Sequence, residues 1–201
     1  MSLGLVPLVL LGSAHAGDLY VCAVPGSCSQ DANCNAAPTD CFDTISSAVI
    51  DAADNDVIYL SDETYSETVV NDGGATGLTV IGEGVGLTFI EGASGAEGVK
   101  FKDVDASFFG LTFTHPGGTI NRHGAKLESG TFLLSDVEFI DCQANHGGGL
   151  DVANGTTVMV ENAMFLNNRS GNSGEGGGHI NMHGGTVTVS NSVFELSLIH
   201  I

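Results

Sequence analysis

The side chains best able to bind or transform a ligand are scarce in this chain. Lys and Arg together number 5 against 24 Asp and Glu, which gives a net charge of −19. Two arginines and two histidines stand in or beside expected loops and are the weak binding candidates: Arg122, His123, His146 and Arg169. For each, a solvated charge or a role in packing a turn is the competing interpretation. No catalytic residue is assigned, because no motif sets a basic side chain opposite an acidic cluster.

Metal chemistry has limited support from the spacing of the histidines. His179 and His183 are four residues apart, which on a strand is roughly 13 Å and too far to share an ion. His123 and His146 occupy one position of a repeated motif, so they would stack about 4.8 Å apart and face one ligand. We expect no cofactor; Ca²⁺ is the ion that Asp- and Asn-bearing turns would suit, although no EF-hand spacing is present.

The acidic composition excludes two classes of partner. Five basic side chains cannot neutralise enough phosphates for nucleic-acid binding. The same shortage argues against unaided binding of an anionic membrane surface or a polyanionic sugar. Beyond the first 16 residues, no segment is apolar enough to predict a transmembrane helix.

Four of the 5 cysteines, Cys22, Cys28, Cys34 and Cys41, are close together in a polar segment. Behind a leader peptide, such a cluster predicts two disulfides, with the pairing left open. A zinc site is the alternative, but the spacing has no CxxC pair and no histidine is near. Cys142 stands apart, either as a buried small apolar residue or as the partner of a cysteine outside this sequence.

The two ends are expected to lie outside the folded domain. Residues 1–16 contain no Lys, Arg, Asp or Glu, and their apolar run is followed by Ala14-His15-Ala16. Small residues at this spacing are typical of signal-peptidase cleavage, so we expect a mature chain beginning at Gly17; a buried first strand is the alternative. Residues 196–201 (LSLIHI) resemble a translated sequencing adapter, so we expect a C-terminal truncation near Glu195.

A repeat runs through the second half of the chain. Its motifs are GLTF at 110–113, DVEF at 136–139, NAMF at 162–165 and NSVF at 191–194. The phenylalanines that end them are 26, 26 and 29 residues apart. Apolar residues alternate with polar ones around each motif, which is typical of a strand with one buried face. The Gly, Asp or Asn that opens each motif predicts a bend with left-handed backbone.

One such coil cannot bury its own apolar face, but stacked coils can. Strands of successive coils would pair in parallel about 4.8 Å apart. Runs of glycine recur between the phenylalanine motifs and indicate turns where backbones pack closely. The pattern therefore predicts an all-β parallel β-helix, and a β-sandwich fits the constant spacing less well. The expected internal ladders consist of Phe113, Phe139, Phe165 and Phe194 and, at the bend, Asn162 and Asn191.

A short helix is expected near the N-terminus. Ile45, Val49 and Ile50 have helical spacing, with Asp43 or Thr44 available as N-cap. A helix there would cover the open end of the stack and shield its first coil.

Short strands are then expected at 57–60, 67–70, 78–81 and 88–90. The expected organisation is a signal peptide at 1–16, a cysteine-rich segment at 17–42, a capping helix at 43–55, a β-helix at 56–195 and the tail at 196–201.

Two sets of motifs resemble known families. DVIYLSDETYSETVV (56–70) and GLTVIGEGVGLTFIEG (77–92) resemble the opening coils of right-handed parallel β-helix proteins of the pectin-lyase-like superfamily. FIDC (139–142), FLNN (165–168), GGGL (147–150) and GGGH (176–179) are similar to the FxxN and GGA[ILV] repeats of polymorphic outer-membrane proteins. Only FLNN satisfies FxxN strictly, and no copy keeps Ala after the glycines. The resemblance covers nearly all of residues 17–195 and implies a right-handed solenoid.

The resemblance leaves two classes of function open. The superfamily includes polysaccharide lyases, which use Asp- and Glu-bound Ca²⁺ with an Arg or Lys base, and hydrolases with paired Asp residues. We expect instead a non-catalytic adhesin-like, structural or glycan-binding module. It would be secreted or exposed on a cell or outer-membrane surface, with cell-surface glycans or envelope components as partners. A Ca²⁺-dependent lyase of pectate-lyase type is the alternative.

Overall fold

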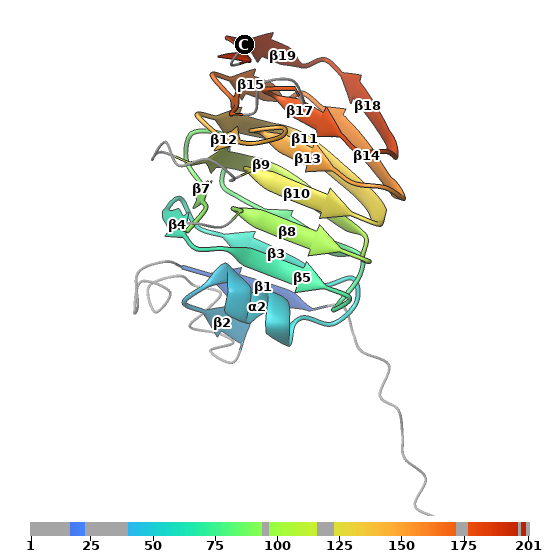
Figure 1. The fold of residues 1–201 in the computed structure, drawn as a ribbon. Helices are drawn as coiled ribbons and strands as arrows, with labels where there is room; N and C mark the ends of the chain where they lie inside the picture. Colours follow the sequence, from blue (N-terminus) through green and yellow to red (C-terminus); the bar gives the residue numbers. More distant parts are fainter. Residues whose placement is uncertain are drawn as a thin grey trace, which may run out of the picture.

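The chain winds into a stack of coils whose strands pair side by side in parallel (Figure 1). This computed structural model describes residues 17–22, 40–93, 97–115, 123–171, 177–196 and 198–199. Within these ranges it forms about five turns of a parallel β-solenoid, built from three parallel sheets. The predicted all-β parallel solenoid is therefore confirmed.

Sheet A is the largest sheet, with 12 strands. Along its main path lie β18 (Thr186–Ser190), β14 (Thr156–Glu161), β11 (Gly130–Ile140), β9 (Ala106–Thr114), β6 (Leu78–Ile81), β3 (Val57–Leu60), β1 (Asp18–Val21) and β2 (Cys41–Phe42). Beside this path lie β4 (Thr64–Ser66), β7 (Phe89–Glu91), β15 (Met164–Leu166) and β19 (Val193–Glu195).

Two smaller sheets complete the coils. Sheet B runs β17 (Ile180–Met182), β13 (Leu150–Val152), β10 (Ala125–Glu128), β8 (Val99–Lys102) and β5 (Val69–Asp72). Sheet C runs β12 (Gln143–Ala144), β16 (Arg169–Ser170) and β20 (Leu198–Ile199). Most of the pairings are thus made between one coil and the next.

Two of the four strands expected in the N-terminal half have the predicted bounds, and two are shifted. The strands at 57–60 and 78–81 are β3 and β6, whereas 67–70 becomes β5 (Val69–Asp72) and 88–90 becomes β7 (Phe89–Glu91). The later start of β5 has a physical reason: the Glu67 N–H donates to the Glu91 carbonyl of β7 in sheet A, and pairing toward β8 in sheet B begins only at Val69.

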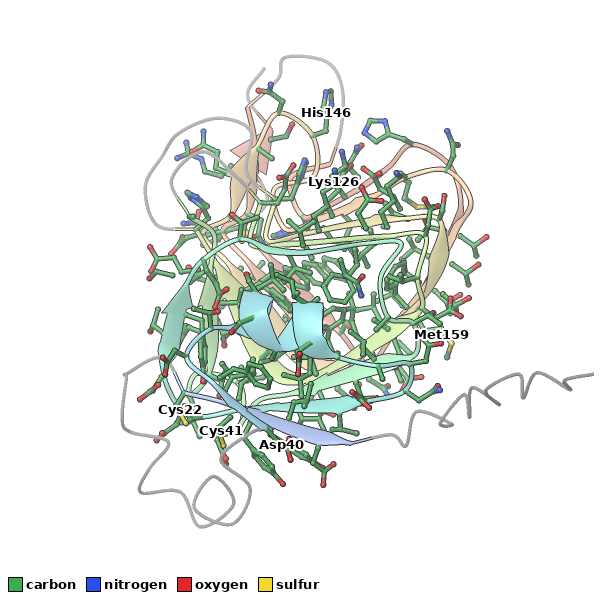
Figure 2. All side chains as sticks on the ribbon, turned by 90° about the horizontal axis from the view of Figure 1, so that it is seen from below. Cys22, Asp40, Cys41, Lys126, His146 and Met159 are labelled. Atoms are coloured by element: carbon green, nitrogen blue, oxygen red, sulfur yellow. The ribbon has the colours of Figure 1, made fainter. Side chains whose placement is uncertain are left out.

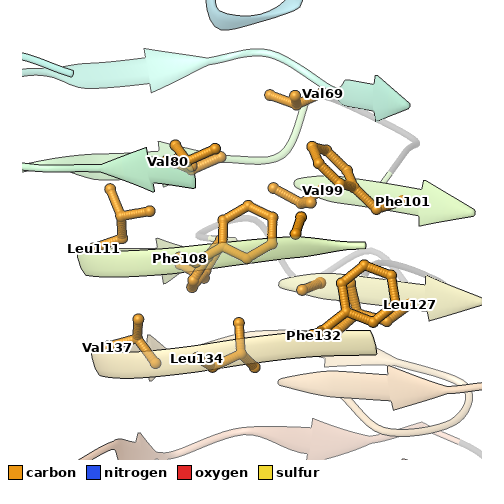
Figure 3. Close-up of a cluster of buried hydrophobic side chains, with 14 of the residues drawn as sticks. Val69, Val80, Val99, Phe101, Phe108, Leu111, Leu127, Phe132, Leu134 and Val137 are labelled. Carbon is orange, nitrogen blue, oxygen red and sulfur yellow. The ribbon is translucent and has the colours of Figure 1, made fainter. Parts of the chain in front are cut away.

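Inward side chains of sheets A and B meet in one continuous apolar core (Figure 3). Phe101 of β8 and Phe108 of β9 pack edge to face, with ring centroids 5.2 Å apart. Phe108 packs in the same manner on Phe113 at 6.1 Å. Because aromatic edges are attracted to aromatic faces, the contact between Phe101 and Phe108 joins sheet B to sheet A across the interior.

The repeated phenylalanines form one file through this core. The register pairs Phe113 with Phe139, Phe139 with Phe165 and Phe165 with Phe194. Their ring centroids are 4.7, 4.8 and 4.8 Å apart, and the rings are nearly parallel. The first three rings are fully buried, but Phe194 is 45% exposed because the described chain places no further coil over it. The expected aromatic ladder is therefore present, and Phe194 is its last described ring.

The bend before each phenylalanine has the left-handed backbone that its Gly, Asp or Asn predicts. The φ angles are 61° at Gly110, 53° at Asp136, 52° at Asn162 and 47° at Asn191. The Asn162 N–H donates to the Ser190 carbonyl of the next coil at 3.2 Å. Among the described residues no hydrogen bond joins the Asn162 and Asn191 side chains, so backbone bonds hold the coils together at this bend.

A buried amide of a different residue joins the coils instead. Asn168 is fully buried, and its side-chain oxygen accepts from the Cys142 N–H at 3.0 Å. Its side-chain nitrogen donates to the Phe139 carbonyl at 2.8 Å. Since a buried polar group needs partners, these bonds fix the turn to the coil before it.

The helix α2 (Ile45–Asp51) lies beside β1 and β2 at the N-terminal end of the stack (Figure 1). Thr44 is its N-cap, and the Thr44 hydroxyl accepts from the Ser47 N–H at 3.1 Å. Ile45 and Val49 are buried, but Ile50 is 82% exposed. The expectation that Ile50 packs inward is wrong, because Ala48 takes that position on the buried face.

The cysteines fall into two groups. Cys22 and Cys41 each take part in a disulfide bond. Cys28 and Cys34 lie outside the described residues, so the pairing of the four stays a prediction. Cys142 is a free, fully buried thiol whose Sγ lies 3.5 Å from the Ile140 carbonyl. Burial raises the pKa of the Cys142 thiol, which keeps it protonated and apolar in character.

The aromatic file predicts a graded effect of truncation. Phe139→Ala removes a ring stacked on both faces and leaves a cavity, so we expect the free energy of unfolding to fall by about 3–5 kcal/mol in a urea titration. Phe194→Ala is the matched control, and its loss should be clearly smaller because the ring is 45% exposed. Equal losses would contradict the role of the file.

The left-handed bend predicts that two substitutions of Asn162 differ in their effect on stability. Asn162→Val places a β-branched residue at a φ of 52°, and we expect a loss of about 1–2 kcal/mol in unfolding free energy. Asn162→Gly should be nearly neutral, since glycine adopts this backbone without strain. If valine were tolerated as well as glycine, the bend would not limit the sequence here.

Candidate functional site

Polar side chains of four successive coils stand in register on the outer face of sheet B. Lys100 pairs with Lys126, Lys126 with Asp151, and Asp151 with Asn181. The next residue along β10, Leu127, is fully buried. Successive residues of a strand point to opposite faces, so this alternation sends the four polar side chains outward. We call them the polar file.

Asp151 is the centre of this face, although it is only 3% exposed. The Asn181 side-chain nitrogen donates to Asp151 Oδ1 at 2.8 Å and also to His183 Nε2 at 2.6 Å. His183 Nε2 itself lies 3.3 Å from Asp151 Oδ1. One amide therefore uses both of its hydrogens to hold a carboxylate and an imidazole side by side.

His123 approaches the same carboxylate from the preceding coil. Its Nδ1 lies 2.8 Å from the Gly147 carbonyl, and its Nε2 lies 3.8 Å from Asp151 Oδ2. A carbonyl only accepts, so Nδ1 donates to Gly147, and Nε2 is the ring nitrogen that faces Asp151. The carboxylate thus stands between two imidazoles.

The expected stacking of His123 on His146 is wrong. The register pairs Ala125 with Leu150, which sets His123 opposite Gly148 rather than His146. The His146 ring instead meets the His183 ring, edge to face, with centroids 5.3 Å apart. His146 Nδ1 is buried without a hydrogen-bond partner. Both histidines still lie at one site. His123 faces Asp151 directly, and His146 contacts His183, whose Nε2 lies 3.3 Å from Asp151 Oδ1.

Lys126 contributes a cation to this face. Its Nζ lies 2.9 Å from Glu128 Oε1. Partial burial lowers the pKa of the Lys126 amine, but the bond to Glu128 and the charges of Glu128, Asp151 and Glu97 outweigh it, so the pKa is raised. Lys126 is therefore a hydrogen-bond donor at neutral pH. Figure 2 shows Lys126 and His146 on one side of the molecule, with Cys22 and Cys41 on the other.

The two predicted arginines have different outcomes. Arg122 lies outside the described residues, so its role stays a prediction. Arg169 is exposed on β16, where it pairs with Gln143 in sheet C rather than with the polar file of sheet B. The structure therefore brings His123 and His146 together at one face but leaves Arg169 on another sheet.

Five members of this site were not among the predicted site residues, namely Lys100, Lys126, Asp151, Asn181 and His183. A signal was present, because a polar residue follows each glycine run closely: Asp151 is the second residue after the run in GGGLD, and Asn181 is the third after the run in GGGHIN. His183 has a neighbour in another coil, since its Nε2 lies 3.3 Å from Asp151 Oδ1. Only the register between coils shows that Asp151 lies beside it.

Within the described residues, neither a metal cluster nor a similar protein indicates what this site binds. Among the described residues, no three His, Cys, Asp or Glu side chains are grouped to hold a metal ion. In the same part of the chain, no helix is long and apolar enough to cross a bilayer. Comparison with protein-family models, curated proteins and solved structures gives no match for this chain. The chemistry of the site therefore comes from its geometry: a carboxylate lies between two imidazole rings, and the Lys126 ammonium donates.

A fourth histidine lies inside the solenoid. His179 is 7% exposed, and its Nδ1 lies 3.1 Å from the Asn168 side-chain nitrogen. Its ring meets the edges of Phe165 and Phe194, with centroids 6.0 and 5.7 Å away. Burial lowers the pKa of His179, so the folded chain holds this ring neutral.

The buried neutral ring predicts a loss of stability in mild acid. A histidine in the unfolded chain takes up a proton at about pH 6.5. The buried His179 ring takes up its proton only at lower pH. The free energy of unfolding therefore falls as the pH drops below about 6.5. We expect His179→Gln to lose less stability than wild type between pH 7.5 and 5.5 in urea titrations. His183→Gln is the control, since that side chain is 46% exposed. An unchanged pH dependence in His179→Gln would contradict this assignment.

Proposed function

We propose that this chain is a non-catalytic β-solenoid module of a secreted or cell-surface protein, and that it binds hydroxyl-rich ligands such as cell-surface glycans. The polar file is the observation that supports it. Lys100, Lys126, Asp151 and Asn181 repeat once per coil, at an expected spacing of about 4.8 Å. A row of donors and acceptors at regular intervals suits a ligand that is itself a chain of repeating units.

The proposal includes the finer features of the fold. We infer right-handed winding and a place among pectin-lyase-like solenoids from the motifs at 56–70 and 77–92, and a likeness to polymorphic outer-membrane repeats from FLNN at 165–168. We infer that α2 caps the first coil, which its buried Ile45 and Val49 support. A secreted location rests on the leader-like residues 1–16.

The chemistry of Lys126 favours binding over a lyase reaction. A lyase needs a basic side chain that can take a proton from the sugar. The raised pKa of Lys126 and its bond to Glu128 keep that amine protonated at neutral pH. Asp151 is already held by Asn181. The protonated Lys126 amine can donate to hydroxyl groups, but it cannot take a proton from a sugar.

Binding to an array of neutral and acidic glycans, and to envelope fractions, tests the proposal. We expect Lys126→Gln to weaken binding by about tenfold, because a charged hydrogen bond is lost. Thr157→Ala is the matched control, since Thr157 is exposed on β14 of sheet A. No binding to any glycan or envelope fraction, or equal losses in both variants, would overturn the proposal.

A second assay separates binding from catalysis. The chain is incubated with uronate polymers and Ca²⁺, and the absorbance of unsaturated sugar products is followed. We expect no increase above the rate without protein. Product formation that Lys126→Gln abolishes would show that the polar file is a lyase site instead.

A further inference from the structure

A buried carboxylate meets the first described residue of the chain. Asp56 is only 5% exposed, at the turn before β3. Its Oδ1 accepts from the Gly17 nitrogen at 2.7 Å, and its Oδ2 accepts from the Ala53 N–H at 2.7 Å. The Gly17 carbonyl in turn accepts from the Val57 N–H at 3.0 Å. Gly17 is therefore fixed on both sides at the start of β1.

Asp56 lacks a cation that would balance its charge. Within the described ranges, none of the ion pairs of Lys, Arg or His involves Asp56. Burying a carboxylate away from water is costly unless it is paired and hydrogen-bonded. Two backbone N–H groups supply hydrogen bonds but no full charge. The missing element is a cationic donor at the position of the Gly17 nitrogen.

We infer that Gly17 is the mature N-terminus and that its α-ammonium is the ion-pair partner of Asp56. The inference rests on the proposed secretion, because Ala14-His15-Ala16 has the small-residue pattern of a signal-peptidase site. Water attacks the Ala16 carbonyl, the bond to the Gly17 nitrogen breaks, and Ala16 leaves as a carboxylate. The released amine takes up a proton, since a free α-amino group has a pKa of about 7.7–8.0.

The geometry suits the charged form. The Gly17 nitrogen lies 2.7 Å from Asp56 Oδ1, the same separation as the Ala53 nitrogen from Oδ2, and an ammonium is accommodated at this distance because charge-assisted bonds are about 2.7–2.9 Å long. An ammonium has two further hydrogens where the peptide has none. Cleavage thus converts a neutral hydrogen bond into an ion pair that holds β1 against β3. Removal of the leader and completion of the first coil become one event.

The chain offers a matched control carboxylate for this inference. Asp54 lies two residues away, is exposed, and accepts from the Thr76 N–H at 2.9 Å. It has the same chemistry as Asp56 but no contact with Gly17. Asp54→Asn therefore reports the loss of a nearby carboxylate that is not joined to the N-terminus.

The test uses the full chain exported from a secreting host, beside a variant with Ser-Gln inserted between Ala16 and Gly17, since Gln directly before Gly17 leaves no small-residue cleavage pattern there. Intact mass and N-terminal sequencing should show a product beginning at Gly17, and in the variant at the inserted Ser. We expect Asp56→Asn to lower the Tm by about 3 °C more in the first product than in the second. Asp54→Asn should lower both equally.

If the Asp56→Asn variant does not fold, the reactivity of the Gly17 amine in the unsubstituted product tests the same inference. The Gly17 amine is acetylated with limiting reagent at neutral pH, and we expect it to react several-fold more slowly in the folded product than in urea. A product that starts elsewhere, equal Tm losses or equal acetylation rates would overturn the inference alone. Failure of export would overturn both the inference and the proposed secretion, whereas failure of glycan binding would leave the inference standing.

Discussion

In-register pairing of parallel strands is the constraint on which the rest of this molecule depends. Each pairing in the second half joins residues about one repeat apart, as Phe139 with Phe113 and with Phe165. Once the register is set, every equivalent side chain stands over its copy in the neighbouring coil. A shift by one residue would turn the phenylalanines outward and the polar residues inward. The aromatic file and the hydrogen-bond ladder therefore select the same alignment.

The same stacking makes the two ends of the solenoid different from its middle. A coil buries its apolar side chains only when another element lies on each side of it. At the N-terminal end, Ile45 and Val49 of α2 belong to the buried core, and the Glu67 carboxylate accepts from the Ile45 and Ser46 N–H groups. At β19 no described coil follows, and Phe194 is half exposed. Burial of a repeated residue thus depends on its place in the stack.

The register also creates chemistry that no single coil contains. Asp151 belongs to one coil, Asn181 and His183 to the next, and His123 to the one before. The last three side chains all lie against the Asp151 carboxylate. The file of polar side chains on sheet B and the Gly17–Asp56 contact share this origin. In each case a buried carboxylate, Asp151 or Asp56, accepts a hydrogen bond from a residue of a neighbouring strand, Asn181 or Gly17. The proposals for glycan binding and for the N-terminus both follow from such contacts.

The sequence by itself determined the local features of the fold, because these depend on spacing within one coil. The left-handed bends at Gly110, Asp136, Asn162 and Asn191, the N-cap at Thr44 and the phenylalanine period could all be predicted from neighbouring residues. The tertiary structure alone decided that Ile50 and Phe194 are exposed, that Asn168 is the buried amide between coils, and that Asp151 lies beside His183. Loops of different length separate the coils, so equal spacing of motifs does not give the partner of each side chain. Only the hydrogen-bonded register between strands does.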